Sequence, residues 1–380
     1  MTGKKTDLPP ASLYIHVPFC SKKCPYCHFF VLPDAAESQK LFLDTLYKEW
    51  LLESHLLEGK EIVSIYLGGG TPSLLSPDAI YAFLDKVYKG PIAISPSCEI
   101  TLEGNPEKTT KSAMQDFLKA GVNRVSLGIQ SFDDTLLKVL GRTHGSDEGE
   151  KAVYSVFEAG IENISIDLMY ELPSQTLSTW EQSVKKASKL PITHLSLYNL
   201  VFEPGTVFYK KKATLSSNLP GEEEALAMLN MATEIFPKQG LSRYEISAFA
   251  KKGFHSVHNT GYWTGRPFLG LGPSAFSYLE GRRFRKTSHL KKWAESIQKG
   301  ISSEEFSEKL SAEASQKELL AVELRLIKGV DLSTFPPLFS SLQESIETLL
   351  TQNLLQKQGS ILSLTEEGLK FYDTVAAEIV

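Results

Sequence analysis

The sequence predicts an α/β fold built on a parallel sheet, either open or partly closed as a barrel. Short apolar, β-branched runs alternate with longer helical patterns between residues 12 and 203, and the alternation stops after that point. Polar or glycine residues stand at the ends of these runs. Strands that are each followed by a helix pair in parallel, and functional sites in such folds lie at the carboxyl ends of the strands.

The expected strands, in chain order, are residues 12–17, 62–67, 98–102, 124–127, 163–168 and 193–197. The helical patterns between them are residues 37–57, 77–88, 110–120, 134–140, 147–159 and 177–190. The first strand leads into a cysteine loop and the second into a glycine run at residues 68–72. Glu103 and Asn105 follow the third strand, Gln130 follows the fourth, and Asp167 ends the fifth. We therefore expect these residues to meet at one end of the sheet.

Beyond residue 204 we expect a helix over 222–239, a strand over 241–249 and a structured loop over 254–278. Helical patterns at 316–326, 341–348 and 366–376, with a hairpin signal around the turn at 356–360, predict a small winged-helix-like domain. Its glutamates argue against DNA binding. The predicted organisation is an N-terminal tail (1–11), a core barrel (12–203), an extension (204–304) and a C-terminal winged-helix-like domain (305–380).

The composition is that of an ordinary globular protein, with 42% hydrophobic and 22% charged residues. The net charge of -5 argues against a nucleic-acid partner. There is no signal-peptide pattern and no run of roughly 18 apolar residues, so we expect a cytoplasmic protein. Four cysteines in 380 residues are too few for a disulfide framework.

Three of the four cysteines, Cys20, Cys24 and Cys27, fall in one loop with the spacing CxxxCxxC. Three thiolates in one loop can hold an iron–sulfur cluster and leave one iron open to a ligand. The alternatives are a zinc site with His16 or His28 as the fourth ligand, or plain buried cysteines. Cys98 opens a strand and is interpreted as a core residue.

The segment from Tyr14 to Cys20, with Cys24 and Cys27, resembles the radical S-adenosylmethionine (SAM) superfamily. More closely it resembles the HemN/HemW branch, the oxygen-independent coproporphyrinogen III oxidases and the related haem chaperones. The resemblance continues through residues 68–72, 124–133, 140–142, 164–170, 244–247, 258–263 and 269–273, nearly the whole chain. It implies a partial (β/α)6 TIM-like radical SAM barrel with a C-terminal α+β extension and the small winged-helix-like domain.

The resemblance also implies the cofactors, a 4Fe–4S cluster on Cys20, Cys24 and Cys27 with SAM at its open iron. A glycine run lets backbone groups approach a ligand closely, and arginine suits a carboxylate. The residues that match SAM contacts are Tyr14, Tyr26, Gly69, Gly70, Thr71, Glu103, Gln130, Arg142 and Asp167.

Residues 258–263 resemble the HNxxYW motif of the haem chaperones, which makes His258, Asn259, Tyr262 and Trp263 candidates for haem binding. The alternative is a histidine held by hydrogen bonds, with local aromatic packing. A basic stretch could meet haem propionates or simply be a solvated face; it comprises Arg282, Arg283, Arg285, Lys286, Lys291 and Lys292.

The sequence departs from the family pattern at several positions. Eleven residues precede the first strand, and Phe29 stands where the oxidases have a further cysteine, which favours the chaperone. His28 stands where haem chaperones usually have aspartate. Glu171 and Ser174 replace expected glycines, and Ser274 and Phe276 replace a glycine and a histidine.

The resemblance therefore implies a radical SAM protein of haem metabolism that binds haem and transfers it to apoproteins such as respiratory enzymes. One alternative is a coproporphyrinogen III oxidase that converts two propionates to vinyl groups through a 5′-deoxyadenosyl radical; the other is a non-enzymatic zinc-binding adaptor. Whether SAM is cleaved, and so whether the chain is an enzyme, stays open. The expected partners are haem or a porphyrinogen and a recipient apo-haem-protein, with membrane contact only through that recipient.

Overall fold

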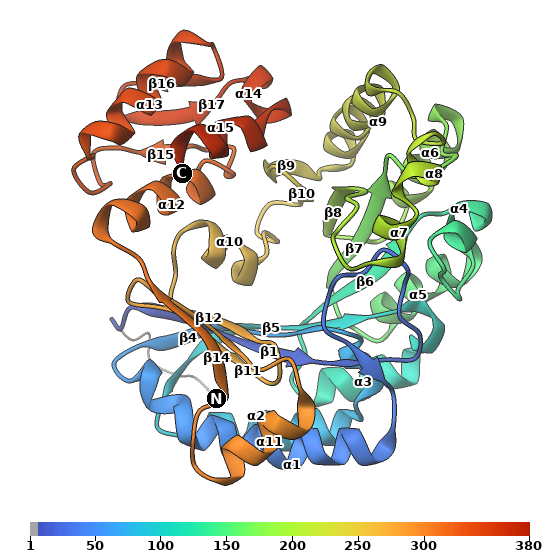
Figure 1. Ribbon diagram of the computed structural model, residues 1–380. Helices are drawn as coiled ribbons and strands as arrows, with labels where there is room; N and C mark the ends of the chain where they lie inside the picture. The colour runs from blue at the N-terminus through green and yellow to red at the C-terminus, as the bar shows by residue number, and fades with distance from the viewer. Residues whose placement is uncertain (1–6) are drawn as a thin grey trace.

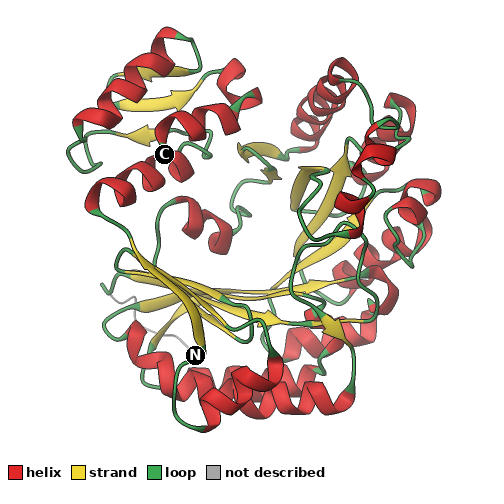
Figure 2. Cartoon of the chain, in the orientation of Figure 1, coloured by secondary structure: helices red, strands yellow, loops and turns green. Residues whose placement is uncertain are grey.

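The computed structural model describes residues 7–380, and a 12-stranded mixed sheet forms its centre (Figures 1 and 2). Residues 1–6 of the predicted tail lie outside the described residues. Consecutive strands of the barrel pair in parallel. They are β1 (Pro10–Val17), β4 (Glu61–Gly69), β5 (Ala93–Gly104), β6 (Arg124–Gln130), β7 (Asn163–Tyr170) and β8 (His194–Asn199). This confirms the predicted α/β class and the partial barrel.

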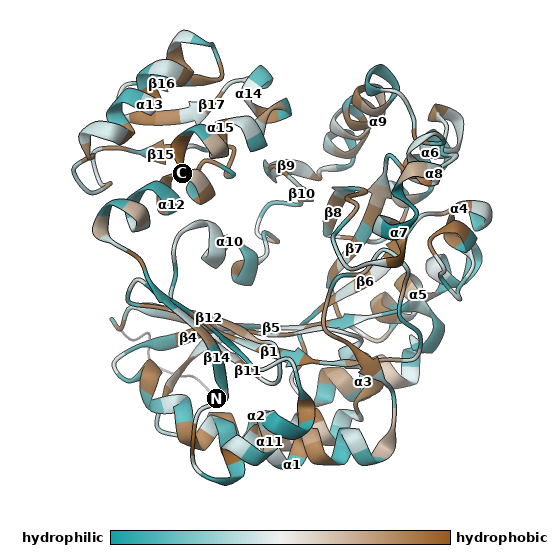
Figure 3. Cartoon of the chain, viewed as in Figure 1, coloured by the Kyte–Doolittle hydropathy of each residue, from teal (hydrophilic) through white to brown (hydrophobic). Residues whose placement is uncertain are grey.

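Helices cover the outer face of these strands, as the sequence pattern predicts (Figure 1). Figure 3 shows apolar and polar residues alternating along the turns of these helices. Ser76, Thr110 and Thr176 each cap a helix by accepting a hydrogen bond from the third backbone N–H that follows. The helices are α1 (Ala36–Glu53), α2 (Pro77–Tyr88), α3 (Lys111–Lys119), α4 (Asp134–Val139), α5 (Ser146–Glu158) and α6 (Leu177–Ala187).

The sheet continues beyond the barrel at both edges, so the barrel stays open. On the β1 edge, β11 (Phe268–Leu271) pairs in parallel with β1, and an antiparallel run follows through β12 (Phe276–Leu279), β13 (Arg282–Lys286) and β14 (Glu304–Lys309). On the β8 edge, the strand expected over 241–249 is two short antiparallel strands, β9 (Ser242–Glu245) and β10 (Ala248–Ala250). The helices of this part are α7 (Val207–Lys210), α8 (Lys212–Ser216), α9 (Glu222–Ile235) and α11 (Leu290–Gln298).

The prediction of a loop over residues 254–278 is wrong. Residues of the HNxxYW motif form α10 (Val257–Trp263), and β11 and part of the antiparallel run follow. The Ser256 hydroxyl caps this helix, and the buried Glu99 carboxylate of β5 accepts hydrogen bonds from the N–H groups of Val257 and His258, both at 3.0 Å. A carboxylate at a helix N-terminus stabilises it, and this one lies more than 150 residues away in the sequence.

The C-terminal segment has its own apolar core and a three-stranded sheet in the order β15-β17-β16. The predicted hairpin is β16 (Leu355–Gln358) and β17 (Ile361–Leu364); β15 (Val330–Asp331) was not expected. The remaining elements are α12 (Ala312–Glu323), α13 (Ser340–Thr351), α14 (Glu366–Lys370) and α15 (Tyr372–Ile379). The domain boundary expected at residue 305 falls inside β14, which pairs with β13 of the large sheet. Among the described helices, none is long and apolar enough to cross a membrane.

A buried polar cluster ties α1 to the extension. Glu49 accepts hydrogen bonds from the indole N–H of Trp293, at 2.9 Å, and from the backbone N–H of Gly272, at 2.7 Å. One turn further along α1, Glu53 pairs with the fully buried Lys286. Burial raises the pKa of Glu49 to about 8, and the neighbouring Glu53 acts in the same direction.

The basic stretch of β13 is neutralised within the chain. Arg282 pairs with Glu304, Arg283 with Glu308 and Glu318, and Arg285 with Glu305. Lys291 and Lys292 are exposed on α11. These pairs leave little free positive charge for propionates, so the stretch is the paired edge of a sheet together with a solvated face.

Three residues that stand where the resemblance expects glycine adopt left-handed backbone conformations. The φ angles are 60° for Glu171, 66° for Ser174 and 71° for Ser274. Non-glycine residues in this region cost roughly 1–2 kcal/mol each. The chain therefore keeps the glycine backbone geometry without glycine.

We predict that Ser174→Gly stabilises the protein by about 0.5–1 kcal/mol, because it removes left-handed strain that exceeds the extra entropy of glycine in the unfolded chain. Ser174 is exposed, and its backbone N–H donates to Asn218 in either variant. The matched control is Ser178→Gly, an exposed serine within α6, which should destabilise by a similar amount. Denaturant unfolding measures both, and destabilisation by Ser174→Gly would contradict the prediction.

We also predict a pH dependence that originates at Glu49. Its pKa of about 8 in the folded protein lies above the ordinary glutamate value of 4.5, so its contribution to stability is complete below about 4.5 and is lost as the pH rises through 8. The free energy of unfolding should fall between pH 7 and 8, and Glu49→Gln should reduce that slope by about 1 kcal/mol per pH unit. Equal slopes for the two proteins in urea unfolding at several pH values would refute the assignment.

Candidate functional site

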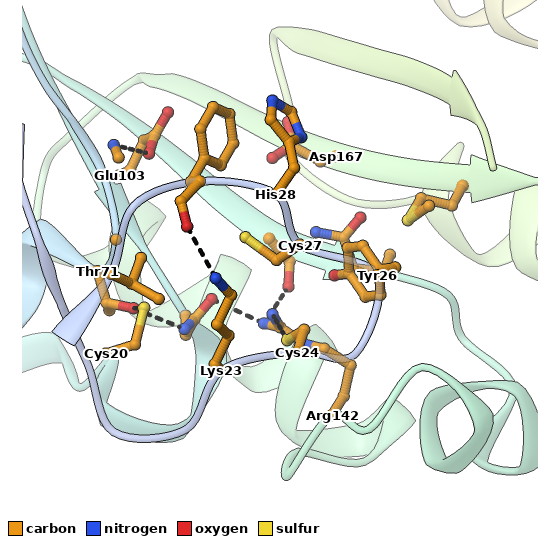
Figure 4. A pocket seen from close by; sticks show the side chains of 18 of the residues that line it. Cys20, Lys23, Cys24, Tyr26, Cys27, His28, Thr71, Glu103, Arg142 and Asp167 are labelled. Atoms are coloured by element: carbon orange, nitrogen blue, oxygen red, sulfur yellow. Dashed lines mark hydrogen bonds between the residues drawn. The ribbon is translucent and has the colours of Figure 1, made fainter. Parts of the chain in front are cut away.

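A cavity of about 440 Å³ opens at the carboxyl ends of the barrel strands (Figure 4). It brings together residues that the sequence analysis collected from the strand ends. Those that line it are Cys20, Cys24, Cys27, Tyr26, Gly69, Gly70, Thr71, Glu103, Gln130, Arg142 and Asp167. Of the predicted SAM contacts, Tyr14 does not line it.

Tyr14 is partly buried on β1 and is connected to the cysteine loop through His16. Its hydroxyl forms a hydrogen bond of 3.0 Å with Nδ1 of His16, and Nε2 of His16 donates to the backbone oxygen of Phe30, at 2.9 Å. His16 is buried, and burial lowers its pKa, so the ring is neutral with both nitrogens occupied. It therefore anchors the loop and is not free to be a fourth metal ligand.

The loop is also fixed by backbone pairing between β2 (Phe19–Cys20) and β3 (Leu32–Pro33). The amide of Asp34 donates to the carbonyl of Cys20, at 3.1 Å. The cysteine segment is thus a closed loop whose two ends pair with each other. Such a closed loop limits the positions that the three thiols can take.

Two of the thiols face hydrogen-bond donors. The Thr71 hydroxyl lies 3.5 Å from Sγ of Cys20, and Nη1 of Arg142 lies 3.6 Å from Sγ of Cys24. All four cysteines are free, and burial raises the pKa of Cys20 and Cys27. Metal binding would deprotonate the thiols of the loop. Cys98 is 4% exposed within the core, as predicted.

The donor set fits a cluster better than a single ion. Within residues 7–380, no three His, Cys, Asp or Glu side chains gather closely enough to hold one metal ion. A cubane takes each thiolate on a separate iron, so it accepts three cysteines spread around one cavity wall. Three cysteines would leave one iron of such a cluster without a cysteine ligand and open to another ligand.

The glycine run packs directly under the cysteine loop. A β-carbon on Gly69, whose φ is 103°, would lie 2.6 Å from the His16 ring, and one on Gly70 would lie 2.5 Å from the carbonyl oxygen of Phe19. The amides of Gly70 and Thr71 donate to the carbonyls of Val17 and Phe19, at 2.8 and 2.7 Å. Glycine is required here because the second strand end must touch the cysteine loop.

Two carboxyl groups line the cavity in unusual states. Glu103 accepts from the Tyr66 hydroxyl, at 2.7 Å, and from the Gly69 amide, at 3.1 Å. Burial raises the pKa of Glu103 to about 7 and that of Asp167 to about 6. Both can be ionised near neutral pH, and a positively charged ligand would favour the ionised form.

Arg142 is fixed by the strand ends around it. Its Nη2 donates to Oδ1 of Asn105, at 2.7 Å, and to the carbonyl of Gly128, at 2.8 Å. Its guanidinium therefore presents a positive charge beside Cys24 with little freedom to move. Gln130 ends β6 with φ at 68°, a left-handed conformation at the cavity edge.

Sequence reasoning missed the apolar lining that follows the sixth strand. Tyr198, Leu200 and Val201 line the cavity, together with Met169 of β7. The strand-end rule applies equally to β8 and would have found them. Tyr66, which orients Glu103 from inside the barrel, leaves no such signal.

The HNxxYW residues lie elsewhere, on α10, which packs against β1 and β4. His258 is 1% exposed; Nδ1 bonds the Ser64 hydroxyl, at 3.0 Å, and Nε2 bonds the Tyr262 hydroxyl, at 2.9 Å. Its ring packs on Tyr66 with 4.8 Å between centroids, and burial lowers its pKa to about 3. In this arrangement neither ring nitrogen is free to bind iron.

The other three residues of the motif share this structural setting. Tyr262 and Trp263 are partly buried, and the guanidinium of Arg325 lies 4.3 Å from the Trp263 ring. Asn259 is partly buried, and its backbone N–H donates to Ser256. The motif thus packs α10 into the barrel, and its role in haem binding stays a prediction.

Comparison with known proteins agrees with this architecture. Residues 14–187 match the model of the radical SAM superfamily, and residues 310–371 match that of the HemN C-terminal domain. The heme chaperone HemW of Lactococcus lactis is 32% identical over 373 residues, which cover 96% of each chain. That of Bacillus subtilis is 31% identical, covering 94% of this chain and 96% of the relative. The solved structure of coproporphyrinogen III oxidase (HemN) from Escherichia coli, a radical SAM enzyme, superimposes with a TM-score of 0.84 at 20% sequence identity. The match covers 98% of this chain and 90% of that chain, so the two proteins share a fold.

We predict that Glu103→Gln weakens SAM binding to the anaerobic, cluster-loaded protein by about tenfold, because the variant loses the negative charge that faces a cationic ligand. The matched control is Glu203→Gln, a partly exposed carboxylate that lines the same cavity and makes none of the Glu103 contacts. Isothermal titration measures both affinities. Equal affinities for the two variants would count against a role for Glu103.

Proposed function

The chain belongs to the heme chaperone HemW family of radical SAM proteins, and on this premise we propose that it binds haem and transfers it to an apoprotein. The observation that carries the proposal is similarity to heme chaperones along 96% of the chain, C-terminal segment included. The partner is then an apoprotein with an empty haem site of its own.

The radical SAM family implies a 4Fe–4S cluster and SAM, and the site has residues suited to both. Cys20, Cys24 and Cys27 would hold the cluster, which supplies one electron to the sulfonium of SAM when both are bound. His16 anchors the loop, and Arg142 places a positive charge beside Cys24. Glu103 and Asp167 offer carboxylates to the ammonium or hydroxyl groups of SAM.

We also propose that the protein acts in the cytoplasm and meets membranes only through its recipient. All four cysteines are free, and the three of the loop must stay reduced to bind iron. The similarity to coproporphyrinogen III oxidase, at 20% identity, concerns the fold and favours no second function.

The proposal predicts two optical signals after anaerobic reconstitution with iron and sulfide. A broad cluster band should appear at roughly 400 nm, and ferric haem should then give a saturable Soret change, since both iron centres absorb in the visible range. Cys24→Ser should lose the cluster band, while Cys98→Ala, the control at a core cysteine, should keep it.

Other outcomes decide between the alternatives. A cluster band without a haem response, together with turnover of coproporphyrinogen III, would establish the oxidase. Zinc without iron in the anaerobically purified protein would establish the zinc-binding adaptor.

A further inference from the structure

We propose that His28, at the mouth of the cavity, is the axial ligand through which this chain binds haem iron. The inference rests on the proposed function, since it takes haem as the bound molecule. It differs from the motif-based expectation, in which His258 is associated with haem.

The eight histidines of the chain differ sharply in accessibility. His16, His144, His194 and His258 are buried, and each has hydrogen-bond partners within the fold. Iron ligation by any of the four would require the ring to be exposed. At His16, His194 and His258 it would also break a hydrogen bond, because both ring nitrogens are bonded. Buried imidazoles therefore make poor sites for a ligand that must be both taken up and released.

The exposed histidines are His28, His55, His255 and His289. His55 bonds the Leu52 carbonyl, His289 caps α11, and His255 stacks on Tyr244 with 4.1 Å between centroids. Only His28 among the eight lines the cavity. Within the described chain its ring contacts Phe29, at 4.6 Å between centroids, and forms no hydrogen bond.

His28 directly follows Cys27, and its ring points away from Cys24 (Figure 4). Figure 4 shows its ring on one side of the loop, and Cys24 and Arg142 on the other. The loop is anchored by His16 and by the β2–β3 pair, so the backbone at His28 is held in place. An imidazole that is exposed, unbonded and carried on a fixed loop can coordinate an iron centre without a change of fold.

Three exposed side chains with large apolar faces line the same cavity as His28. Phe29 is 49% exposed, Tyr198 45% and Val201 54%, and all three line the cavity mouth. Large apolar side chains gathered at an open cavity mark a ligand surface, and aromatic rings pack well on a flat macrocycle. A tetrapyrrole would bury these faces while its iron meets His28.

The charges at the mouth complement the remaining part of haem. Lys22 and Lys23 line the same cavity, and Lys23 also donates to the Phe29 carbonyl, at 3.1 Å. Two ammonium groups suit the two propionates of haem. One molecule thus accounts for the free imidazole, the apolar faces and the positive charge.

The cavity lining divides into two parts that can serve two ligands. The strand ends contribute polar side chains such as Glu103 and Asp167, which suit SAM. The cysteine loop and the segment after β8 contribute His28, Phe29 and Val201, which suit haem. The haem would therefore lie against the rim, with its iron close to the cluster loop.

The test is a ferric haem titration of the anaerobic, cluster-loaded protein, followed by absorption and electron paramagnetic resonance. His28→Ala should lower haem affinity roughly tenfold or more and remove the spectral signature of imidazole ligation, and free imidazole should restore that signature. Iron content, sulfide content and SAM affinity should stay as in the parent protein. Because His28 is exposed, this variant should fold normally.

Two controls sharpen the test. His55→Ala removes an exposed histidine far from the cavity lining and should bind haem as the parent protein does. His258→Gln keeps side-chain hydrogen-bonding groups inside the barrel and should retain the imidazole signature. Its thermal unfolding is measured alongside, so that loss of fold is recognised.

Three results would overturn the assignment. Parental affinity and spectrum in His28→Ala would remove the role of His28 and leave the proposed function standing. Loss of cluster iron in that variant would make His28 a cluster ligand. Absence of any haem response in the parent protein would overturn the proposed function itself, and the ligand assignment with it.

Discussion

The buried ring of His16 is the point on which the rest of the site depends. Its Nδ1 accepts a hydrogen bond from the Tyr14 hydroxyl, and its Nε2 donates one to the carbonyl of Phe30. These two bonds connect the cysteine loop to the end of β1. The same ring leaves room only for glycine at position 69 on the neighbouring strand. Imidazole is suited to this task because, in its neutral form, it offers one donor and one acceptor on opposite sides of a rigid ring.

The interior of the barrel connects this site to α10. The His258 ring packs on Tyr66, and the Tyr66 hydroxyl orients Glu103 at the cavity wall. Glu99 holds the N-terminus of the same helix from β5. The HNxxYW residues thus support the wall of the cavity from below, and a substitution among them would disturb the site without touching a ligand. An effect of such a substitution on haem would need a separate test of the axial ligand.

Within the described residues, positively charged side chains are paired on β13 and unpaired at the cavity mouth. The arginines of β13 are paired with glutamates of β14 and α12, whereas Lys22 and Lys23 remain at the cavity mouth. Free positive charge is therefore found where an anionic ligand could reach it, and not on the basic stretch that the sequence makes conspicuous. A run of arginines in sequence says little about charge until its partners across the sheet are known.

The sequence by itself determined the α/β class, the parallel strands, the cysteine loop and most of the cavity lining. Strand period, helix caps and the position of a residue at a strand end are local signals. They are sufficient to predict that Glu103, Gln130 and Asp167 lie at the same edge of the sheet. Tertiary structure decided the rest, because it depends on contacts between distant segments. Residues 257–263 became a helix through a carboxylate on β5, Tyr14 was separated from the cavity by His16, and His258 was buried against β4. Burial and hydrogen-bond partners also determine which histidine is free to bind a ligand, and a sequence pattern contains no information about either.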